Sequence, residues 1–375
     1  MAVQGTAILL FFANTLFSSF LRVPNVRDQT LFHLPRLSLL LLSLILLSCQ
    51  KTERTVHRSF YYWKTVYDPT AKEKAALDSL DIDHLFVRLF DVGVDETNGV
   101  VQPQGKITWE QQPVGLTITP VVFITQEALR SGDSTALDSL AARMGRLSAA
   151  LTRGVSLSNE WQIDCDWSAG TKARYFRLLR QLRQQPFAQG KTLSVTVRLH
   201  QLKYIAEAGV PPADRGLLMA YNLGNLRDPS AENSILENKE LDKYVRSAAR
   251  YPLPLDAALP LFDWYVWFSE NRYKGLVHHF DSSLQAPGRI AFTTDTTIEG
   301  YPFRKGDWLR HEAVSAEALS VAAGHLSQQL PSADVRVLLF DLDEQNLDRY
   351  QFHELETLFE RFGRGAARPR ATKRR

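Results

Sequence analysis

The sequence predicts an α/β protein that folds as a single (β/α)8 TIM-type barrel with a long insertion between its seventh and eighth strands. The first observation is that the 375-residue chain contains eight short runs rich in Val, Ile, Leu and Phe. Such nearly continuous apolar runs are typical of parallel strands that are covered on both faces. The second is that helical patterns fill most gaps between the runs. No linker divides the body, and eight strands with crossovers in about 310 residues fit one barrel.

The elements follow one another in the order that such a barrel requires. The expected strands span residues 59–67, 84–92, 118–125, 161–166, 193–200, 216–222, 257–268 and 335–343. The expected helices span residues 70–80, 135–151, 171–185, 236–249, 315–329 and 351–362. Thr171 is a suitable N-cap for the third of these helices, whose apolar face consists of Tyr175, Leu178, Leu179 and Leu182. The connections 94–117 and 201–215 look irregular, and residues 269–334 form the insertion, which is rich in aromatic residues around 301–308.

The formal charge of +3 is distributed unevenly along the chain. Residues 1–49 carry +2 and residues 361–375 carry +7, so residues 50–360 carry −6. A nucleic-acid-binding fold would show a basic stripe, and this mildly acidic body shows none, so we expect no nucleic-acid partner. We expect the basic segment 361–375 to be disordered, either touching anionic headgroups or solvated, and we favour the solvated state.

Residues 1–49 have the pattern of an export signal. An apolar run at 37–47 follows Arg36 and ends in Leu-Leu-Ser-Cys at residues 46–49, which resembles the lipidation motif of bacterial lipoproteins. This pattern predicts that Cys49 carries a lipid, that residues 50–360 form the barrel, and that the protein is anchored in the bacterial cell envelope, on the outer membrane or periplasmic face. The alternative is a signal anchor in which Cys49 has no role. Cys165 lies in an apolar strand pattern and is expected to be buried.

Polar residues gather at the carboxyl ends of the predicted strands, which surround the mouth of a (β/α)8 barrel. Their alternation puts Asp164 with Asp166, and Arg198 with His200, on common faces. The strand starts, by contrast, show few ionisable groups. One interpretation is a structural layer of salt bridges in which arginines neutralise the acids. The other is a ligand site in which aromatic rings at the same ends stack on sugar rings. The candidate residues are Arg88, Asp91, Asp164, Asp166, Trp167, Arg198, His200, Tyr221, Asn222, Trp264, Asp341 and Asp343.

Two of these strands carry a family resemblance. The segment Trp-Gln-Ile-Asp-Cys-Asp-Trp at residues 161–167 resembles the fourth strand of family-18 glycoside hydrolases, which are chitinase-like barrels, and Met-Ala-Tyr-Asn at 219–222 resembles their sixth-strand motif. The chain also looks like an uncharacterised group of bacterial lipoproteins with glycoside-hydrolase-like barrels. The resemblance implies that Asp164 and Asp166 orient the acetamido group of a sugar and that Tyr221 hydrogen-bonds it.

The sequence departs from that family at positions that the family uses for catalysis. The family's general acid is a Glu directly after the Trp, and this chain has Ser168 there, whose hydroxyl cannot protonate a leaving group near neutral pH. Asn222 replaces the family's Asp in the sixth-strand motif, and Glu160 lies at the opposite end of its strand. Hydrolysis by the family's route is therefore in doubt.

Two functions remain open. In the first, mouth carboxylates hydrolyse a glycosidic bond, and Asp166 with Asp341 or Asp343 is the preferred pair. In the second, the barrel binds a glycan without cleaving it. Both predict an oligosaccharide or polysaccharide partner, and substrate contacts by Arg88, Asp91, Asp164, Trp167, Arg198, His200, Tyr221, Asn222 and Trp264.

We expect no cofactor and no metal. The sequence contains neither a Gly-rich phosphate loop nor a Gly-x-Ser-x-Gly elbow. A Ca²⁺ or Mg²⁺ ion held by Asp341 and Asp343 is conceivable, but two acids at i and i+2 are a weak signal. Besides the hydrolase and the glycan-binding protein, the third functional class that we consider is a purely structural protein of the cell envelope.

Overall fold

The computed structural model describes residues 54–131, 134–277 and 288–364, with only the backbone described for 134–136. The predicted signal segment, Cys49 and residues 365–375 of the basic segment lie outside the described residues. The chain divides into two compact units, Met1–Lys51 and Thr52–Arg375, and all described residues belong to the second unit. Within the described ranges, no helix is both long and apolar enough to cross a membrane.

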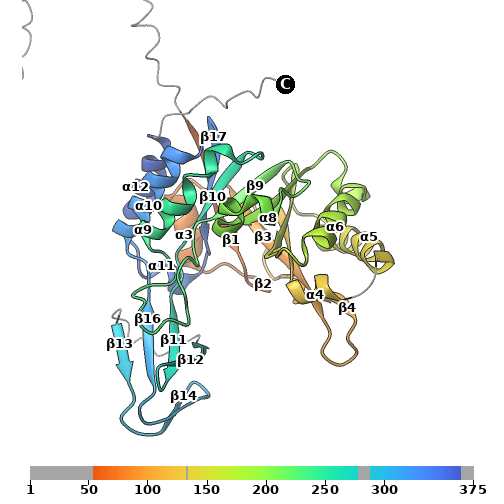
Figure 1. Cartoon of the computed structure of the whole chain (residues 1–375). Helices are drawn as coiled ribbons and strands as arrows, with labels where there is room; N and C mark the ends of the chain where they lie inside the picture. The colour runs from red at the N-terminus through yellow and green to blue at the C-terminus, as the bar shows by residue number, and fades with distance from the viewer. Residues whose placement is uncertain (1–53, 132–133, 278–287, 365–375) are drawn as a thin grey trace, which may run out of the picture. The chain divides into compact units, whose positions relative to one another are not determined.

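Eight parallel strands close into a barrel, which confirms the predicted fold class (Figure 1). The ring closes because β1 pairs in parallel with β17 on one side and with β3 on the other. In ring order the strands are β1 (Thr55–Tyr62), β3 (His84–Val94), β6 (Thr117–Ile124), β7 (Glu160–Cys165), β8 (Thr192–Arg198), β9 (Arg215–Met219), β10 (Leu255–Pro260) and β17 (Asp334–Phe340).

Each predicted crossover helix is present. The long helices are α3 (Ala71–Ser79), α5 (Ser134–Leu151), α6 (Lys172–Arg183), α9 (Asn238–Val245), α10 (Ala316–Gln329) and α12 (Phe352–Gly363). Shorter turns are α4 (Gln126–Arg130), α7 (Leu199–Lys203), α8 (Ile205–Ala208) and α11 (Glu344–Leu347), with 3-10 turns η1 (Pro186–Ala188) and η2 (Ala248–Arg250). Helix α6 buries its predicted apolar face. Thr171 precedes it but does not cap it, because its hydroxyl accepts a hydrogen bond from Ser168 N at 2.9 Å instead.

The predicted seventh strand is split into two strands of different sheets. The barrel strand β10 ends at Pro260, and β11 (Trp264–Ser269) begins a separate antiparallel sheet. Between the two strands, Asp263 is the only residue that interrupts the apolar run, so periodicity alone did not reveal the break. The prediction that Asp263 and Trp264 lie within the seventh barrel strand is therefore wrong. Likewise, the predicted first strand divides into β1 and the two-residue β2 (Val66–Tyr67), which pairs with β5 (Thr108–Trp109).

The insertion between the seventh and eighth barrel strands builds its own small sheet. Its strands lie in the order β12 (Arg272–Val277), β11, β16 (Trp308–Glu312) and β13 (Gly288–Ala291), and β14 (Thr296–Ile298) pairs with β15 (Tyr301–Phe303). A second, smaller hydrophobic core joins the pair β14–β15 to this sheet. It consists of Tyr265, Val277, Phe303 and Leu309. Asp263 ties the insertion to the segment after β17, because it accepts hydrogen bonds from His311 Nε2 and Arg349 Nη1, each at 2.8 Å. The connection 94–117, which was expected to be irregular, contains β5 and a second strand, β4 (Val101–Gln104), that pairs antiparallel with β3.

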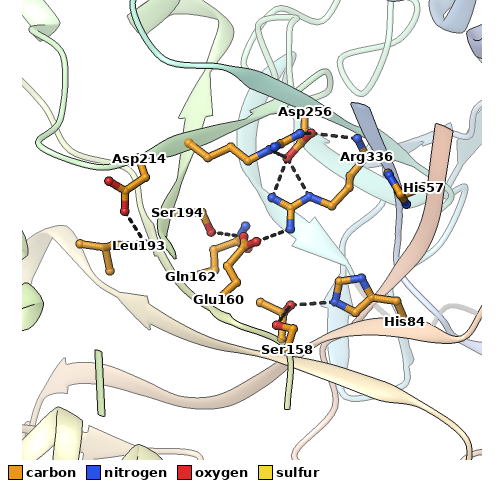
Figure 2. A network of polar contacts seen from close by, with 12 residues as sticks. His57, His84, Ser158, Glu160, Gln162, Leu193, Ser194, Asp214, Asp256 and Arg336 are labelled. Atoms are coloured by element: carbon orange, nitrogen blue, oxygen red, sulfur yellow. Dashed lines mark hydrogen bonds and ion pairs between the residues drawn. The ribbon is translucent and has the colours of Figure 1, made fainter. Parts of the chain in front are cut away.

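The amino-terminal end of the barrel is closed by ion pairs (Figure 2). Arg336 at the start of β17 bridges Glu160 of β7 and Asp256 of β10, and Arg215 of β9 also pairs with Asp256, with Nε to Oδ2 at 2.5 Å. Glu160 also accepts a hydrogen bond from Ser194 Oγ at 2.5 Å. The sequence reading underestimated the ionisable groups at the strand starts, because they come singly from different strands. Each buried charge here has an opposite partner, which makes its burial tolerable.

Candidate ligand-binding mouth

Four half-buried aromatic rings lie at the carboxyl ends of the barrel strands. Phe123 and Phe340 are among the last two residues of β6 and β17, Trp63 directly follows β1, and Phe262 comes two residues after the end of β10. The Trp63 ring centroid lies 5.4 Å from that of Phe340 and 6.4 Å from that of Phe123, while Phe262 lies 5.9 Å from Phe340. We call these four residues the aromatic floor. A continuous apolar surface with polar edges is what a sugar ring needs for stacking.

Asp164 stands on β7 and is 6% exposed. Its Oδ1 accepts a hydrogen bond from Thr196 Oγ1 of β8 at 2.6 Å. Burial, followed by the charge of the neighbouring Asp166, raises the pKa of Asp164 to about 7. A carboxyl group in this position is therefore close to half protonated at neutral pH, and it can donate as well as accept a hydrogen bond.

Asp166 directly follows β7 and forms a two-point ion pair with Arg198 at the end of β8. The geometry is a guanidinium fork on a carboxylate, which holds both side chains in place. His200 follows on α7 and is exposed. Loss of water around its ring and the Arg198 charge lower the pKa of His200, so the imidazole is neutral at pH 7. The predicted group Asp164, Asp166 and Arg198 is thus brought together.

Tyr221 is the least satisfied polar group of the mouth. It follows β9, its ring lies 5.6 Å from that of Phe340, and its buried hydroxyl has no hydrogen-bond partner among the described residues. Burial, then the charge of Asp164, raises the pKa of this hydroxyl, and Asp166 and Asp341 add to the effect. The Tyr221 hydroxyl is therefore within electrostatic reach of carboxyl groups on or after β7 and of one that follows β17. Asn222 is exposed, with a left-handed backbone at φ 57° that Asn tolerates.

The two predicted acids after β17 have different surroundings. Asp341 accepts a hydrogen bond from Asn346 Nδ2 at 2.6 Å, and burial together with the charge of Asp343 raises its pKa to about 7. Asp343 caps α11 through Gln345 N at 2.9 Å. Its other oxygen lies 2.9 Å from Lys64 Nζ. The structure thus gives Asp343 two structural partners and leaves Asp341 the freer acid.

Lys64 links helix α3 to the start of helix α11. Its ammonium contacts Asp343 and also Glu73 of α3, at 2.5 Å. Burial alone would lower the pKa of Lys64, but the hydrogen bonds to Glu73 and Asp343 raise it above its ordinary value. Lys64 therefore stays charged, and it supplies one of the cations that the mouth needs.

Arg88 and Asp91 form a third cluster, on β3. Arg88 Nη1 donates to Asp91 Oδ2 at 2.8 Å, and Arg88 Nε donates to the Trp63 carbonyl at 3.1 Å. The guanidinium therefore fixes the backbone at the edge of the aromatic floor. Asp91 Oδ1 is buried without a partner among the described residues. An unpaired buried carboxylate oxygen is costly, which makes this a strained corner of the mouth.

Two predicted contact residues do not face a ligand. Trp167 is 1% exposed, stacks on Tyr175 of α6 with centroids 5.2 Å apart, and donates its indole N–H to the Ala208 carbonyl at 3.0 Å. It therefore belongs to the core behind β7. Trp264 is buried and donates to Glu312 Oε2 at 2.9 Å, so only its ring, 5.3 Å from that of Phe262, borders the floor.

The sequence reading missed Phe123, Phe262, Phe340, Lys64 and Thr196. Phe340 lies inside the predicted strand 335–343, and only the structure shows that the strand ends there. Lys64 and Thr196 carry no sequence signal of their own, because only the folded chain brings Lys64 to Glu73 and Asp343. The same holds for Thr196 and its partner Asp164. In the described part of the chain, no three His, Cys, Asp or Glu side chains are placed to hold a metal ion together.

The comparisons with known proteins bear on the fold. No family model matches the chain, and no curated protein matches it in sequence. Among solved structures, the chain is similar to a chitinase from Chromobacterium violaceum, with a TM-score of 0.51 and 13% identity over 84% of this chain and 100% of that one. It is also similar to the spore cortex-lytic enzyme SleL of Bacillus cereus, with a TM-score of 0.50 and 14% identity over 83% of this chain and 75% of that one. At these identities the likeness concerns the fold alone, and the chain shares the (β/α)8 barrel of these two proteins.

Proposed function

We propose that the mouth of this barrel binds an oligosaccharide and hydrolyses a glycosidic bond. The observation that carries the proposal is the aromatic floor bordered by carboxyl groups, all at the carboxyl ends of the strands, where (β/α)8 enzymes place their active sites. The chitinase and the cortex-lytic enzyme with similar folds support a carbohydrate as the ligand. Rings that stack on the apolar faces of sugars and acids that bond their hydroxyl edges are complementary to such a ligand.

Asp341 is the proposed general acid. Its pKa of about 7 leaves much of it protonated near neutrality, and it is half-buried, whereas Asp164 lies deeper and is bonded to Thr196. In the proposed step Asp341 gives its proton to the glycosidic oxygen as the bond to the anomeric carbon breaks. Asp166 is the proposed second carboxylate, which either attacks that carbon or takes a proton from an attacking water. Asp343 is not retained as a catalytic candidate, because one of its oxygens pairs with Lys64 and the other caps α11.

A glycan-binding protein without catalysis is the second candidate. It is favoured by the two-point pair of Asp166 with Arg198, which ties up the proposed second carboxylate, and by Ser168 at the position where the family has its acid. In that case Asp164, Asp166 and Tyr221 bond sugar hydroxyls or an acetamido group.

The test uses residues 50–375, incubated with a panel of neutral oligosaccharides that includes N-acetylglucosamine oligomers. Mass spectrometry follows cleavage and calorimetry follows binding. Hydrolysis predicts products that disappear in Asp341→Asn and in Asp166→Asn but persist in Asp78→Asn, a control on the exposed face of α3. Binding that Trp63→Ala weakens, without products, establishes the binding protein. Neither cleavage nor binding across the panel refutes the carbohydrate proposal. If there are products, their anomeric configuration tells attack by Asp166 from attack by water.

We further propose that Cys49 is lipidated and that the protein is anchored in the bacterial cell envelope. The support is the Leu-Leu-Ser-Cys pattern after an apolar run, followed at once by polar sequence. Metabolic labelling with a palmitate analogue should mark the wild-type protein and not the Cys49→Ser variant. Label retained in that variant would refute lipidation at this residue.

A further inference from the structure

Strand β7 and the residue after it carry a column of four polar side chains. Glu160, Gln162, Asp164 and Asp166 alternate with Trp, Ile and Cys, and side chains two residues apart along a strand lie on the same face. The column runs from the amino-terminal ion pairs to the mouth. A buried polar group needs a hydrogen-bond partner, and a buried charge also needs an opposite charge. Each member of the column therefore needs a partner of its own kind.

Three of the four groups have the partner that their chemistry requires. Glu160 pairs with Arg336 (Figure 2). Gln162 accepts a hydrogen bond at Oε1 from the Tyr61 hydroxyl. Asp166, at the mouth, forms its two-point ion pair with the guanidinium at the end of β8. The column is therefore complete below Asp164 and above it.

Asp164 is the carboxyl group of the column that lacks a cation. Its Oδ1 accepts the proton of Thr196 Oγ1 at 2.6 Å, and that hydroxyl in turn accepts a hydrogen bond from Cys165 N at 3.3 Å. Within the described ranges, neither oxygen of Asp164 forms an ion pair, because the nearest guanidinium, that of Arg198, is bonded to Asp166. A buried carboxylate with one neutral partner is not compensated in charge.

A second buried polar group beside Asp164 also lacks a partner. Tyr221 is 3% exposed, and its hydroxyl forms no hydrogen bond with any described residue. Burial raises the pKa of this hydroxyl most, and the charge of Asp164 comes next, so the two groups are electrostatic neighbours. Both border the aromatic floor: the Tyr221 ring lies 5.6 Å from that of Phe340, and Asp164 is the register partner of Phe123. The floor is therefore bordered by an acid without a cation and a hydroxyl without a partner.

We propose that the sugar bound at the mouth carries a free, protonated amino group, which donates hydrogen bonds to Asp164 and to the Tyr221 hydroxyl oxygen. This inference rests on the proposed function, because it names the class of sugar that the same site accepts. An ammonium group supplies the positive charge that the column lacks, and charge-assisted hydrogen bonds are stronger than neutral ones. The faces of aromatic rings also attract a cation. A hydroxyl or acetamido group can donate to Asp164 but leaves its charge uncompensated.

The first experiment compares tetramers of glucosamine and of N-acetylglucosamine by calorimetry at pH 6.5. It uses residues 50–375, which contain the whole compact unit that begins at Thr52. The glucosamine tetramer should bind at least tenfold more tightly. Equal affinities, or tighter binding of the N-acetylated tetramer, overturn the inference and leave the proposed function intact. Binding of neither tetramer, nor of any other oligosaccharide in the panel, refutes the proposed function and the inference together.

The second experiment separates the contact with Asp164 from general attraction of a cation to an acidic protein. Asp164→Asn can still accept the hydrogen bond from Thr196 but carries no charge, so the ratio of the two affinities should fall to about one. Asp78→Asn removes the same charge from the exposed face of α3 and should leave the ratio unchanged. A preference for glucosamine that survives Asp164→Asn, or that Asp78→Asn removes equally, overturns the assignment. Urea denaturation shows whether each variant is folded before its affinities are compared.

Discussion

Replacing Asp164 by Asn should stabilise the protein at alkaline pH and change little at acid pH. Asn has nearly the same shape, and its carbonyl oxygen can still accept the hydrogen bond from Thr196 Oγ1. The substitution removes only the ability to ionise. The folded-state pKa of Asp164 is raised from 3.8 to about 7, so the folded protein holds a proton there that the unfolded chain has already lost.

The sign and size of the effect follow from that difference. A raised pKa gives a contribution that is fully present below pH 3.8 and is lost as the pH rises towards 7, where the folded carboxyl ionises. A shift of about three units corresponds to about 4 kcal/mol at most. Above pH 7.5 the wild type should therefore have lost up to about 4 kcal/mol that Asp164→Asn keeps.

Urea denaturation of both proteins at pH 4, 6 and 8 measures the difference. The free energy of unfolding of the variant minus that of the wild type should grow with pH, and Asp78→Asn, an exposed site, should show no such trend. A difference that stays constant from pH 4 to pH 8, or one that falls, would refute the argument that burial keeps Asp164 protonated.

Three further outcomes test other parts of the structure. Arg336→Met should lower the free energy of unfolding by about 3–5 kcal/mol in urea, because it leaves the buried carboxylate of Glu160 without its cation, yet sugar binding measured by calorimetry should not change. Trp63→Ala should weaken oligosaccharide binding about tenfold while leaving its stoichiometry unchanged, since the floor loses one ring. Arg198→Gln removes the partner of Asp166 and a charge that lowers the pKa of Asp164, so the pH at which stability falls in a urea series should move upward.

Much of the fold could be predicted because parallel barrel strands leave a clear sequence pattern. All eight strands and six crossover helices lie where continuous apolar runs and helical periodicity place them. The break between β10 and β11 was missed because Asp263 is the only charged residue from Leu259 to Phe268, although Trp264 and its neighbours pair with β16 instead of the barrel. Partner choice across a sheet is a tertiary property, and local pattern does not contain it.

The site was predictable in position and less so in detail. Strand ends indicate the mouth, so Asp164, Asp166 and Arg198 could be expected there. Successive side chains point to opposite faces, and a one-residue difference therefore separates Asp166, which faces Arg198, from Trp167, which packs on α6. The sequence also could not show which acid is paired, since the partner of Asp343 is Lys64, which follows β1 at the other end of the chain.

The two ends of the barrel differ in how completely their buried charges are paired, and this difference bears on function. At the amino-terminal end, Glu160 and Asp256 are matched by Arg336 and Arg215, as a structural layer requires. At the mouth, acids outnumber cations, the Tyr221 hydroxyl and one oxygen of Asp91 have no hydrogen-bond partner in the described ranges, and two carboxyl groups have pKa values of about 7. A layer that served only stability would gain from pairing these groups or replacing them. Their persistence beside an aromatic floor is best explained by a hydroxyl-rich ligand that supplies the missing hydrogen bonds.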